Sequence, residues 1–374
     1  MNAIYLDNNA TSPLLPCVWE AMQPYALARW GNPASSHRFG RRARQALEDA
    51  RECIAALLDA HPDEVHFTSG ATEANNLAIL GHAHGAHGAL GVIVTSLIEH
   101  PSVLEPFRYL EKAGHPLRLL PVTSEGYVHA DDPLDGARFA AIQLANHETG
   151  AIQPVAELAC RAPVHCDAAA AAGKMRVSFR ALDVATLAIG AHKFHGPPGI
   201  GALVVRRGVK LSPLFHGGHQ QHGTRPGTEP VALAVGMAAA LAWSLEHLDA
   251  NHATLVRLRQ GILTRLRRDA EPVLLNGPED GGLPGTFNLA FPGCNADALL
   301  MKLDLAGVAC STGSACSSGS LLPSPVLAAM GKTGPALHSA LRFSFSTLLS
   351  EAELEESARR IADCVRSLRR ADAG

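Results

Sequence analysis

The sequence predicts an α/β protein whose main part is built around a mostly parallel sheet, with a second, smaller block of strands and helices toward the C-terminus. In the first half of the chain, short apolar runs at 65–67, 91–96, 139–144 and 164–167 alternate with helical patterns. Such alternation is typical of βαβ units, which build a parallel sheet. With 374 residues, 47% of them hydrophobic, the chain can bury one large core and a second smaller one.

The N-terminal region is predicted to form two helices before the first of these runs. Residues 13–30 have a helical pattern, and Gly31-Asn32-Pro33 ends it. Ser35 or Ser36 is then expected to cap a long second helix. Its apolar residues recur at every third or fourth position: Phe39, Ala43, Leu47, Ala50, Ile54 and Leu57.

Composition and charge exclude several classes of partner. The net charge is -3, from 32 basic and 35 acidic residues, so we expect no nucleic-acid partner. The arginines between 38 and 44 are interpreted as a solvated helix face. No run is long enough to span a membrane, and the N-terminus lacks the apolar segment of a signal peptide. The 8 cysteines form no CxxC pair, which predicts reduced thiols and a cytoplasmic protein.

A glycine turn leads into a helix at residues 68–73. Thr68-Ser69-Gly70 follows the strand at 65–67, and Ala71-Thr72-Glu73 begins a helix that runs through Leu80. The free N–H groups of a helix start, its dipole and the Thr72 hydroxyl can together hold a phosphate. An ordinary capped helix, with Ser69 or Thr72 as the cap, is the alternative.

Two ionisable residues follow expected strands in the same half of the chain. His100 stands between the strand at 91–96 and a helix that Pro101 begins. Asp167 ends the strand at 164–167. Because open α/β sheets bind ligands at the carboxyl ends of their strands, both side chains are candidates for one site.

Lys193 lies on a Gly/Pro-rich turn between apolar runs at 184–189 and 202–205. A lysine on such a turn can be partly desolvated, which lowers its pKa and leaves the amine free to form a Schiff base. An amine, an acid for a pyridinium nitrogen, a histidine and a phosphate-type helix start are the groups that pyridoxal phosphate needs. The sequence therefore predicts pyridoxal 5'-phosphate as cofactor.

Ten segments, in the same order, resemble the fold-type I, class V aminotransferase family and, within it, the cysteine desulfurases. They are YLDNNAT (5–11), GNPASSHRFG (31–40), FTSGATEANNLAI (67–79), EH (99–100), ANHETGAIQ (145–153), HCDA (165–168), HK…GPPGIGAL (192–203), RPGT (225–228), STGSAC (311–316) and LRFS (341–344). The resemblance covers essentially the whole chain. It implies a large domain with a mostly parallel seven-stranded sheet, which binds the cofactor, and a smaller α/β C-terminal domain.

The expected domain boundary lies near residue 250, between long helices at about 230–248 and 252–269. We assign residues 15–250 to the large domain, and residues 1–14 with 251–374 to the small one. The small domain would carry a mobile cysteine loop at about 308–322, as in the desulfurases with a long loop.

The resemblance implies which residues handle the cofactor ring and the reaction. Lys193 would carry the Schiff base, Asp167 would pair with the ring nitrogen, and His100 would stack on the ring and move protons. Cys316 lies in a stretch of small residues too polar to pack as core. Its thiolate would attack the sulfur of bound L-cysteine, leaving alanine and a persulfide for a sulfur-acceptor protein. Cys310 is interpreted as a structural residue.

The resemblance also implies how phosphate and substrate are held. Ala71, Thr72 and His192 would bind the phosphate, and Thr228 would reach the same site from the partner subunit of a homodimer. Arg342 would bind the substrate carboxylate as a bidentate pair, the geometry to which guanidinium is suited.

Four positions depart from the family's pattern. Ala170 replaces a glutamine that donates to the cofactor's phenolic oxygen, and His147 replaces an asparagine near that oxygen and the substrate carboxylate. Gly190 replaces a serine on the phosphate, and an arginine expected near 346–347 is absent. We expect the His147 imidazole to fill the space left at Ala170 and to supply one donor to cofactor and substrate. The missing hydroxyl at Gly190 is expected to weaken cofactor binding.

Two other functions fit parts of the pattern. A lyase with the same cofactor, acting on selenocysteine or cysteine sulfinate, would not need Cys316. A divergent, non-catalytic sulfur carrier would explain the departures but not the presence of Lys193, Asp167, His100 and Arg342. The histidines at 82, 84 and 87 are interpreted as a polar loop, and no metal site is expected.

Overall fold

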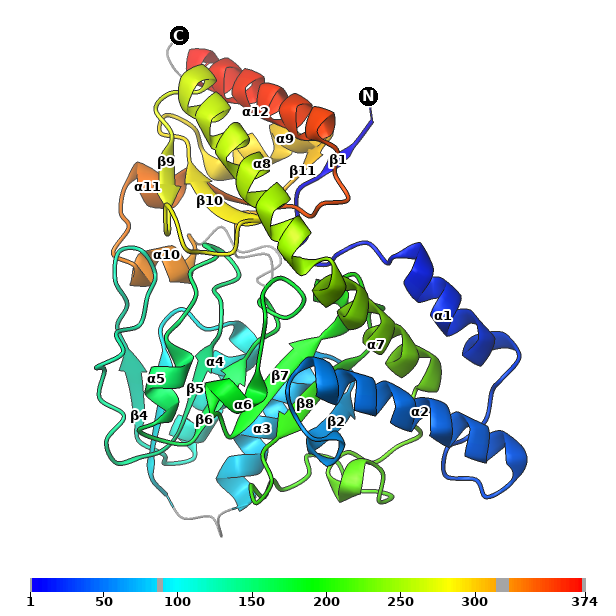
Figure 1. Ribbon diagram of the computed structural model, residues 1–374. Helices are drawn as coiled ribbons and strands as arrows, with labels where there is room; N and C mark the ends of the chain where they lie inside the picture. The colour runs from blue at the N-terminus through cyan, green and yellow to red at the C-terminus, as the bar shows by residue number, and fades with distance from the viewer. Residues whose placement is uncertain (1, 86–89, 314–322, 372–374) are drawn as a thin grey trace.

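The computed structural model describes residues 2–85, 90–313 and 323–371, which form a large lobe and a small lobe (Figure 1). Seven strands make the sheet of the large lobe. In spatial order they are β2 (Val65–Thr68), β8 (Gly201–Val205), β7 (Thr186–Gly190), β6 (Val164–Asp167), β5 (Ala137–Gln143), β3 (Val92–Ser96) and β4 (Leu117–Leu120). Only β8 runs antiparallel to its neighbours, so the mostly parallel seven-stranded sheet predicted above is confirmed.

Helices cover both faces of this sheet, which is why its strands read as continuous apolar runs. On one face, α3 (Ala71–Gly85) and α4 (Pro101–Lys112) pack over alternate strand residues such as Ile93 and Ala141. On the other face, α1 (Pro16–Leu27), α2 (Arg38–Leu57) and α7 (Val231–Glu246) bury the intervening residues, among them Val94 and Ile142. Both faces of the sheet are therefore buried in hydrophobic cores.

The small lobe has a three-stranded antiparallel sheet with two long helices beside it. The sheet has the order β12 (Ala340–Ser344), β10 (Thr286–Ala290), β9 (Leu274–Asn276), and the helices are α8 (Leu248–Asp269) and α12 (Glu351–Ala371). Near the N-terminus of the chain, β1 (Ile4–Tyr5) pairs in parallel with β11 (Val308–Ala309), beside α9 (Ala296–Leu305). Ile4 and Leu6 join the core of this lobe, so the start of the chain packs with its C-terminal part.

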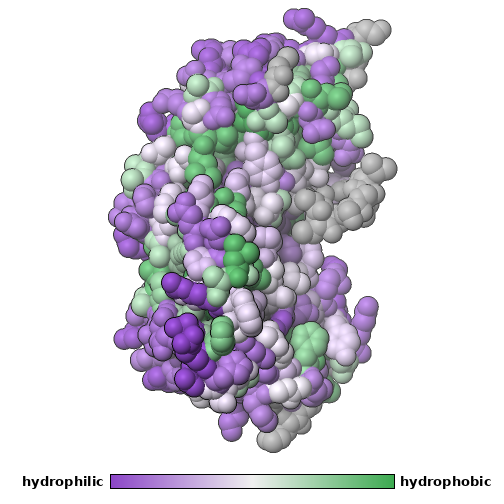
Figure 2. Space-filling model, turned by 90° about the vertical axis from the view of Figure 1, so that its right-hand side faces the viewer, coloured by the Kyte–Doolittle hydropathy of each residue, from purple (hydrophilic) through white to green (hydrophobic). Residues whose placement is uncertain are grey.

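Short elements connect these parts. They are η1 (Pro62–Glu64), α5 (Val155–Ala159), α6 (Phe179–Leu182), η2 (Ala191–Lys193), η3 (Gln221–Gly223), α10 (Pro325–Ala329) and α11 (Pro335–His338). By length and hydropathy, no helix in the described ranges would cross a membrane by itself, although α7 and α8, bent by 67°, pass the same test as a pair. Figure 2 shows one face of the molecule, on which hydrophobic residues are scattered among hydrophilic ones.

The predicted cap of the second helix was wrong. His37 caps α2, and its Nδ1 accepts a hydrogen bond of 3.2 Å from the backbone N–H of Gly40. Ser35 cannot take that place because its backbone already lies against the first turn. A Cβ added at Gly40 would lie 2.2 Å from the carbonyl oxygen of Ser35.

The histidine tract is not a loop as far as it is described. α3 continues to Gly85 and includes His82 and His84, whereas His87 lies outside the described residues. The His82 ring packs against Phe139, with 4.8 Å between ring centroids. Burial of one side of the helix on the sheet therefore extends the helix beyond the predicted end at Leu80.

Candidate active site

One cavity lies at the carboxyl ends of the parallel strands, where the sequence places its candidate residues. β6 ends at Asp167, α3 begins directly after the β2 turn, and η2 follows β7. The cavity is lined by these predicted residues: Ala71, Thr72, His100, His147, Asp167, His192 and Lys193. The departing residue Ala170 lines it as well.

A buried amide fixes the carboxylate of Asp167. Asn75 of α3 donates from Nδ2 to Asp167 Oδ2 over 2.8 Å, and the backbone N–H of Ala169 donates to Oδ1 over 2.9 Å. The Asn75 oxygen is in turn 2.9 Å from Nε2 of His165, whose other ring nitrogen lies 2.8 Å from the Thr186 hydroxyl. These contacts leave the Asp167 side chain in one orientation at the cavity wall.

The same amide orients His100. Asn75 Nδ2 donates to Ser102 Oγ over 2.9 Å, and that hydroxyl lies 2.8 Å from His100 Nδ1. The backbone N–H of Ser102 also donates to His100 Nδ1, over 3.1 Å. Because Nδ1 accepts, the ring proton is placed on Nε2. Burial lowers the pKa of His100, so the ring is neutral at neutral pH.

Lys193 is held by the N-terminal segment of the chain. Its Nζ donates to the backbone carbonyl oxygen of Asn9 and, over 3.1 Å, to that of Ala10. The hydroxyl of Ser12 donates to the carbonyl oxygen of the preceding residue, His192, over 2.7 Å. Residues from the start of the chain thus fix the turn that carries the amine.

The phosphate end of the cavity is formed by the start of α3 and by His192. The first-turn N–H groups of a helix have no intrahelical partner and favour an anion. Burial lowers the pKa of His192 to about 4, so this ring binds as a neutral group. Gly190 packs closely here, because a Cβ at this position would lie 3.3 Å from Cβ of Ala71. The close approach of α3 therefore leaves little room for a side chain at position 190.

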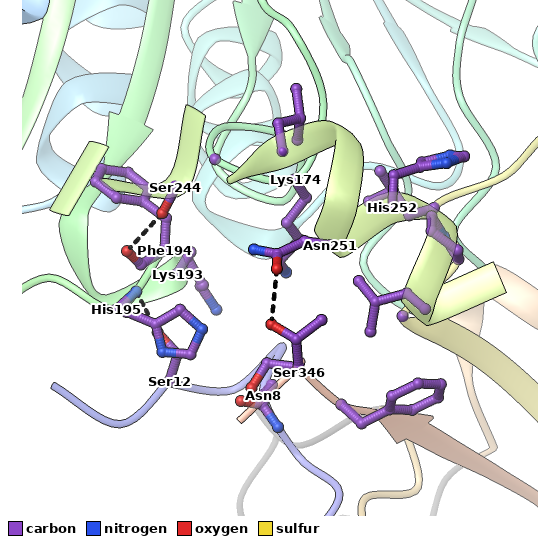
Figure 3. A pocket seen from close by; sticks show the side chains of 18 of the residues that line it. Asn8, Ser12, Lys174, Lys193, Phe194, His195, Ser244, Asn251, His252 and Ser346 are labelled. Atoms are coloured by element: carbon purple, nitrogen blue, oxygen red, sulfur yellow. Dashed lines mark hydrogen bonds between the residues drawn. The ribbon is translucent and has the colours of Figure 1, made fainter. Parts of the chain in front are cut away.

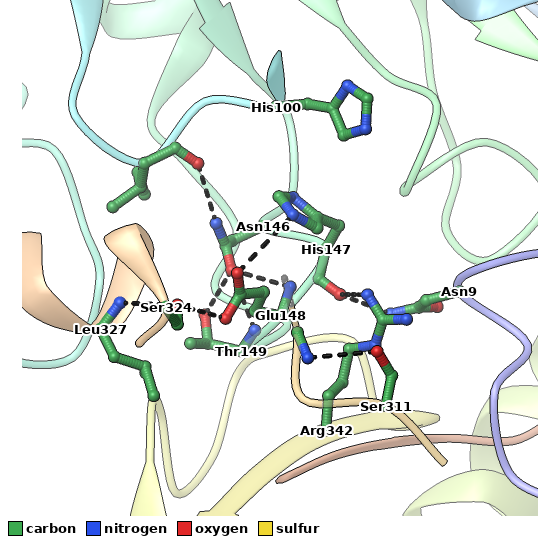
Figure 4. Close-up of polar contacts among 12 residues, drawn as sticks. Asn9, His100, Asn146, His147, Glu148, Thr149, Ser311, Ser324, Leu327 and Arg342 are labelled. Carbon is green, nitrogen blue, oxygen red and sulfur yellow. Dashed lines mark hydrogen bonds and ion pairs between the residues drawn. The ribbon is translucent and has the colours of Figure 1, made fainter. Parts of the chain in front are cut away.

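His147 and Glu148 lie side by side beneath the cavity (Figure 4). Burial lowers the pKa of His147 well below its usual value, and its Nδ1 is buried without a hydrogen-bond partner among the described residues. Its ring centroid is 5.4 Å from that of His100. Glu148 is 1% exposed, and burial raises its pKa to about 7. Its Oε2 accepts a hydrogen bond of 2.7 Å from Ser324 Oγ.

Arg342 projects from β12 toward the same region. Its Nη2 forms an ion pair of 2.6 Å with Asp7 Oδ1, and its Nη1 lies 3.5 Å from the carbonyl oxygen of His147. Its Nε is buried and makes no hydrogen bond within the described ranges. The guanidinium is therefore fixed beside His147 rather than in the cavity lining.

A model of the class-V aminotransferase family matches residues 4–356. The chain belongs to this family. Among curated relatives of this family member, cysteine desulfurase IscS of Dictyoglomus turgidum is 42% identical over 360 residues, which cover 94% of this chain and 91% of the relative. The IscS-like cysteine desulfurase of Mycobacterium tuberculosis is 40% identical to this chain, and the aligned region covers 98% of this chain and 97% of that relative. The chain thus falls among the cysteine desulfurases of the class-V family.

Solved structures give the same assignment for this class-V family member. A NifS-like protein superposes with a TM-score of 0.92 and 32% identity, covering 98% of this chain and 100% of its own. A structure described as SspA in complex with cysteine has a TM-score of 0.81 and 32% identity, with coverages of 91% and 98%. The fold-type I assignment made from the sequence is confirmed.

The residues present fit pyridoxal phosphate, the cofactor of this family. An amine, a fixed carboxylate and a helix start line one cavity, at Lys193, Asp167 and Ala71. His147 Nδ1 adds a buried polar atom that has no hydrogen-bond partner among the described residues and that a bound group would satisfy. The cofactor prediction is confirmed by the family assignment, and the cavity is suited to it.

Two residues singled out in the sequence, Thr228 and Cys310, do not line this cavity, and a third cannot be placed. Thr228 is exposed and does not line the cavity of its own chain. Cys316 lies outside the described residues. Cys310 packs against the core of the small lobe, and burial raises the pKa of its thiol to about 12, so it is not a nucleophile at neutral pH.

Three residues that build the site were missed by the sequence reasoning: Asn9, Asn75 and Lys174. Asn75 follows Ala71 by one helical turn, so helix periodicity places both on one face and could have identified it. Asn9 lies within the YLDNNAT segment, but its contacts depend on how the start of the chain folds back onto the site. Lys174 carries no local signal, because a Gly-Lys pair after an alanine tract is unremarkable in a sequence.

Proposed function

We propose that this protein is a cysteine desulfurase that converts L-cysteine to L-alanine and retains the sulfur as a persulfide on Cys316. One observation carries the proposal: Lys193, Asp167 and His100 converge on a single cavity at the strand ends. The cysteine desulfurase relatives, and a solved neighbour that holds cysteine, support the choice of substrate.

Pyridoxal phosphate, when bound, supplies an electron sink that stabilises negative charge on the substrate's carbon atoms. Lys193 would attach the cofactor through its amine, and the Asp167 carboxylate would hold the ring nitrogen in its protonated form. His100 is neutral and carries its proton on Nε2, so this nitrogen can donate a proton at the substrate. The Asn75 contacts keep the carboxylate and the imidazole in fixed relative positions.

The substrate carboxylate is assigned to the region between His147 and Arg342. Arg342 Nε and His147 Nδ1 are the buried atoms there that lack described partners. A guanidinium N–H donates to a carboxylate over a short, charge-assisted bond. The ion pair with Asp7 keeps the Arg342 side chain extended toward this region.

Cys316 would remove the sulfur. Its thiolate attacks the sulfur atom of the bound cysteine, forming an S–S bond while the substrate's C–S bond breaks. The electron pair of that bond stays on carbon, which takes a proton to become the methyl group of alanine. The sulfur remains on Cys316 as a persulfide, ready for transfer to the thiol of an acceptor protein.

We also propose a cytoplasmic homodimer that passes its sulfur to an acceptor protein for iron–sulfur cluster assembly or another thio-cofactor. The names of the relatives support a role in sulfur transfer. The exposed position of Thr228, away from its own cavity, is compatible with a contact to a second subunit. The cysteine pattern supports a reducing compartment.

The deciding experiment measures alanine formation from L-cysteine by the purified protein with added pyridoxal phosphate. We expect alanine from the wild type and none above background from Cys316→Ala, while Cys310→Ala keeps wild-type activity. Alanine from Cys316→Ala at the wild-type rate would contradict the nucleophile and favour a lyase for selenocysteine or cysteine sulfinate. No alanine from the wild type would contradict the proposed activity.

A further inference from the structure

A carboxylate lies at the phosphate end of the cofactor cavity. Glu73 stands in the first turn of α3 and lines the cavity together with residues 69–72. The positive end of a helix dipole attracts a carboxylate, but it attracts a phosphate as well. Because like charges repel, an ionised Glu73 works against the binding of a phosphate beside it. The proposed reaction gives this residue no task.

Glu73 fixes the glycine turn that precedes α3. Its Oε2 accepts a hydrogen bond of 2.7 Å from the backbone N–H of Ser69. On the other side of the turn, Thr68 Oγ1 donates to the carbonyl oxygen of Gly70 over 3.0 Å. These two side chains set the path of the backbone whose N–H groups face the cavity. The carboxylate therefore has a structural task, although its charge is unfavourable at this position.

Arg225 pairs with this carboxylate through two nitrogen atoms. Its Nε donates to Glu73 Oε1 over 2.8 Å, and its Nη2 donates to Oε2 over 3.3 Å. Both side chains are largely buried, with exposed fractions of 24% for Arg225 and 10% for Glu73. Burial raises the pKa of Glu73, but the hydrogen bonds from Arg225 and Ser69 outweigh it and lower the pKa below its usual value. Glu73 is thus ionised at neutral pH, and the pair has no net charge.

The loop that carries Arg225 is itself fixed. It connects β8 to α7, and its buried residue Gln221 accepts a hydrogen bond of 2.8 Å from the backbone N–H of Phe67 in β2. The side chain of Gln220 accepts another, of 3.2 Å, from the backbone N–H of Gly227. These contacts hold the loop on both sides of Arg225. The guanidinium is therefore held beside the turn by the scaffold, as a precise binding site requires.

The two lysines of the cavity are directed elsewhere. Lys174 and Lys193 also line a second cavity, between α7, α8 and the N-terminal segment, and residues 69–73 do not line it. Figure 3 shows both side chains reaching into this second cavity. Lys174 Nζ donates to Asn9 Oδ1 over 2.7 Å, and Lys193 Nζ donates to the backbone oxygen of Asn9. Neutralisation of Glu73 is therefore left to Arg225, with which it forms an ion pair.

We propose that Arg225 is a positioning residue for the cofactor phosphate: it cancels the charge of Glu73, so that this carboxylate can hold the glycine turn without repelling the phosphate. This inference rests on the proposed function, since it concerns how the cofactor is kept. It assigns Arg225 an effect on the phosphate alone, not on the pyridine ring or the aldehyde.

The test compares the binding of two ligands to variants that differ in charge beside the turn. Cofactor-free protein is titrated with pyridoxal phosphate and, separately, with pyridoxal, which lacks the phosphate, and absorbance gives both dissociation constants. Glu73→Gln keeps an oxygen for Ser69 and leaves a net positive charge, so it should bind pyridoxal phosphate about fivefold or more tightly than the wild type. Arg225→Met leaves a net negative charge and should bind it about fivefold or more weakly.

The double variant Glu73→Gln/Arg225→Met again has no net charge at this position. We expect its affinity for pyridoxal phosphate to return to within about twofold of the wild type, and the affinity for pyridoxal to stay within about twofold in all variants. Arg207→Met is the matched control, because Arg207 forms an exposed two-nitrogen pair with Asp63. It should bind both ligands as the wild type does.

The outcomes separate this inference from the proposed function. Equal losses of affinity for both ligands in Arg225→Met overturn the inference, because they reveal a merely structural role. A double variant as weak as Arg225→Met also overturns it, as does a comparable loss in Arg207→Met. A wild type that does not bind pyridoxal phosphate overturns the proposed function and the inference together.

The inference can be tested even where Arg225→Met does not fold. Glu73→Gln keeps the hydrogen-bond acceptor of the turn and leaves Arg225 in place, so it changes only the charge. If Glu73→Gln binds pyridoxal phosphate no more tightly than the wild type, the inference is overturned. Arg225→Lys keeps the positive charge and should stay within about twofold of the wild-type affinity for pyridoxal phosphate.

Discussion

At the scale of single residues, His147 and Arg342 determine how the substrate side of the site is closed. Each has a buried nitrogen with no hydrogen-bond partner in the described part of the chain. Such atoms cost free energy unless a bound group satisfies them. A site of this kind is completed by its ligand, and an imidazole at position 147 changes the shape and the donor that the ligand meets.

We predict that His147 and Ala170 are coupled. Both line the same cavity. His147→Asn alone removes the imidazole ring and leaves empty space. Ala170→Gln alone crowds the imidazole, and such overpacking destabilises a protein by about 1–3 kcal/mol. The double variant His147→Asn/Ala170→Gln should therefore bind the cofactor and turn over cysteine better than either single variant. Cofactor dissociation constants and alanine formation rates for the four proteins give the coupling energy.

A control is provided by Thr72→Ser, which lines the cavity at the phosphate end. Combined with His147→Asn, it should show additive effects, because distant sites combine within about 0.5 kcal/mol. If the His147 and Ala170 changes also combine additively, the two positions do not compensate each other.

At the scale of elements, Glu148 joins two parts of the chain beneath the site. Its Oε2 accepts from the Ser324 hydroxyl, which also accepts from Leu327 N and so caps α10. Gly313 approaches the same carboxylate so closely that an added Cβ would lie 2.4 Å from Oε2. Gly313 and Ser324, one on each side of the stretch that contains Cys316, thus both lie close to one buried carboxyl group.

We predict that Glu148 makes the stability of the protein depend on pH. Its pKa of about 7 in the folded protein lies above the ordinary 4.5, so the folded state binds the proton more tightly than the unfolded state. The stability from this group is complete below about pH 4.5 and falls by about 3 kcal/mol as pH rises to 7. Glu148→Gln keeps an oxygen for Ser324 and should abolish this part of the pH dependence.

The measurement is the unfolding midpoint in denaturant at several values between pH 4.5 and 8. Glu52→Gln, on the exposed side of α2, is the matched control and should follow the wild type. A Glu148→Gln protein that loses as much stability as the wild type over this range would show that the carboxyl group does not titrate there.

The elements of this protein could be predicted from its sequence more fully than the contacts between distant segments. The apolar runs between helical patterns predicted the sheet, because each strand is buried on both faces. The residues after the strands predicted the cavity, because parallel strands end at one edge. Lys174 and Asn9 could not be predicted, since their meeting depends on the N-terminal segment crossing from the small lobe to the site. The His37 cap depends equally on a tertiary contact, the packing of Ser35 against Gly40.

At the scale of the whole molecule, the site lies where the two lobes meet. The N-terminal segment connects them: Asn9 bonds to Ser344 of the small lobe, and Ser12 bonds to the His192 turn of the large lobe. One described chain supplies the amine, the acid and the guanidinium. It does not bring Thr228, which is exposed, to its own cavity.

We predict that Thr228 completes the phosphate site of the partner subunit, so that complementary variants restore each other. Lys193→Ala cannot attach the cofactor, and Thr228→Ala should lose about tenfold or more in cofactor affinity through one charge-assisted hydrogen bond. Each site of the dimer would combine Lys193 of one subunit with Thr228 of the other. A mixed dimer of the two variants therefore has one site with both substitutions and one site with neither. Mixing the two inactive or weakened proteins under subunit exchange should therefore create cofactor sites of wild-type affinity, at one per mixed dimer.

Titration of the mixture with pyridoxal phosphate, followed by absorbance, counts these high-affinity sites. A mixture of Lys193→Ala with the double variant Lys193→Ala/Thr228→Ala is the control and should form none. If Thr228 acted within its own chain, each site of the mixed dimer would keep one of the two defects. High-affinity sites would then be absent from every mixture, and the shared site would be disproved.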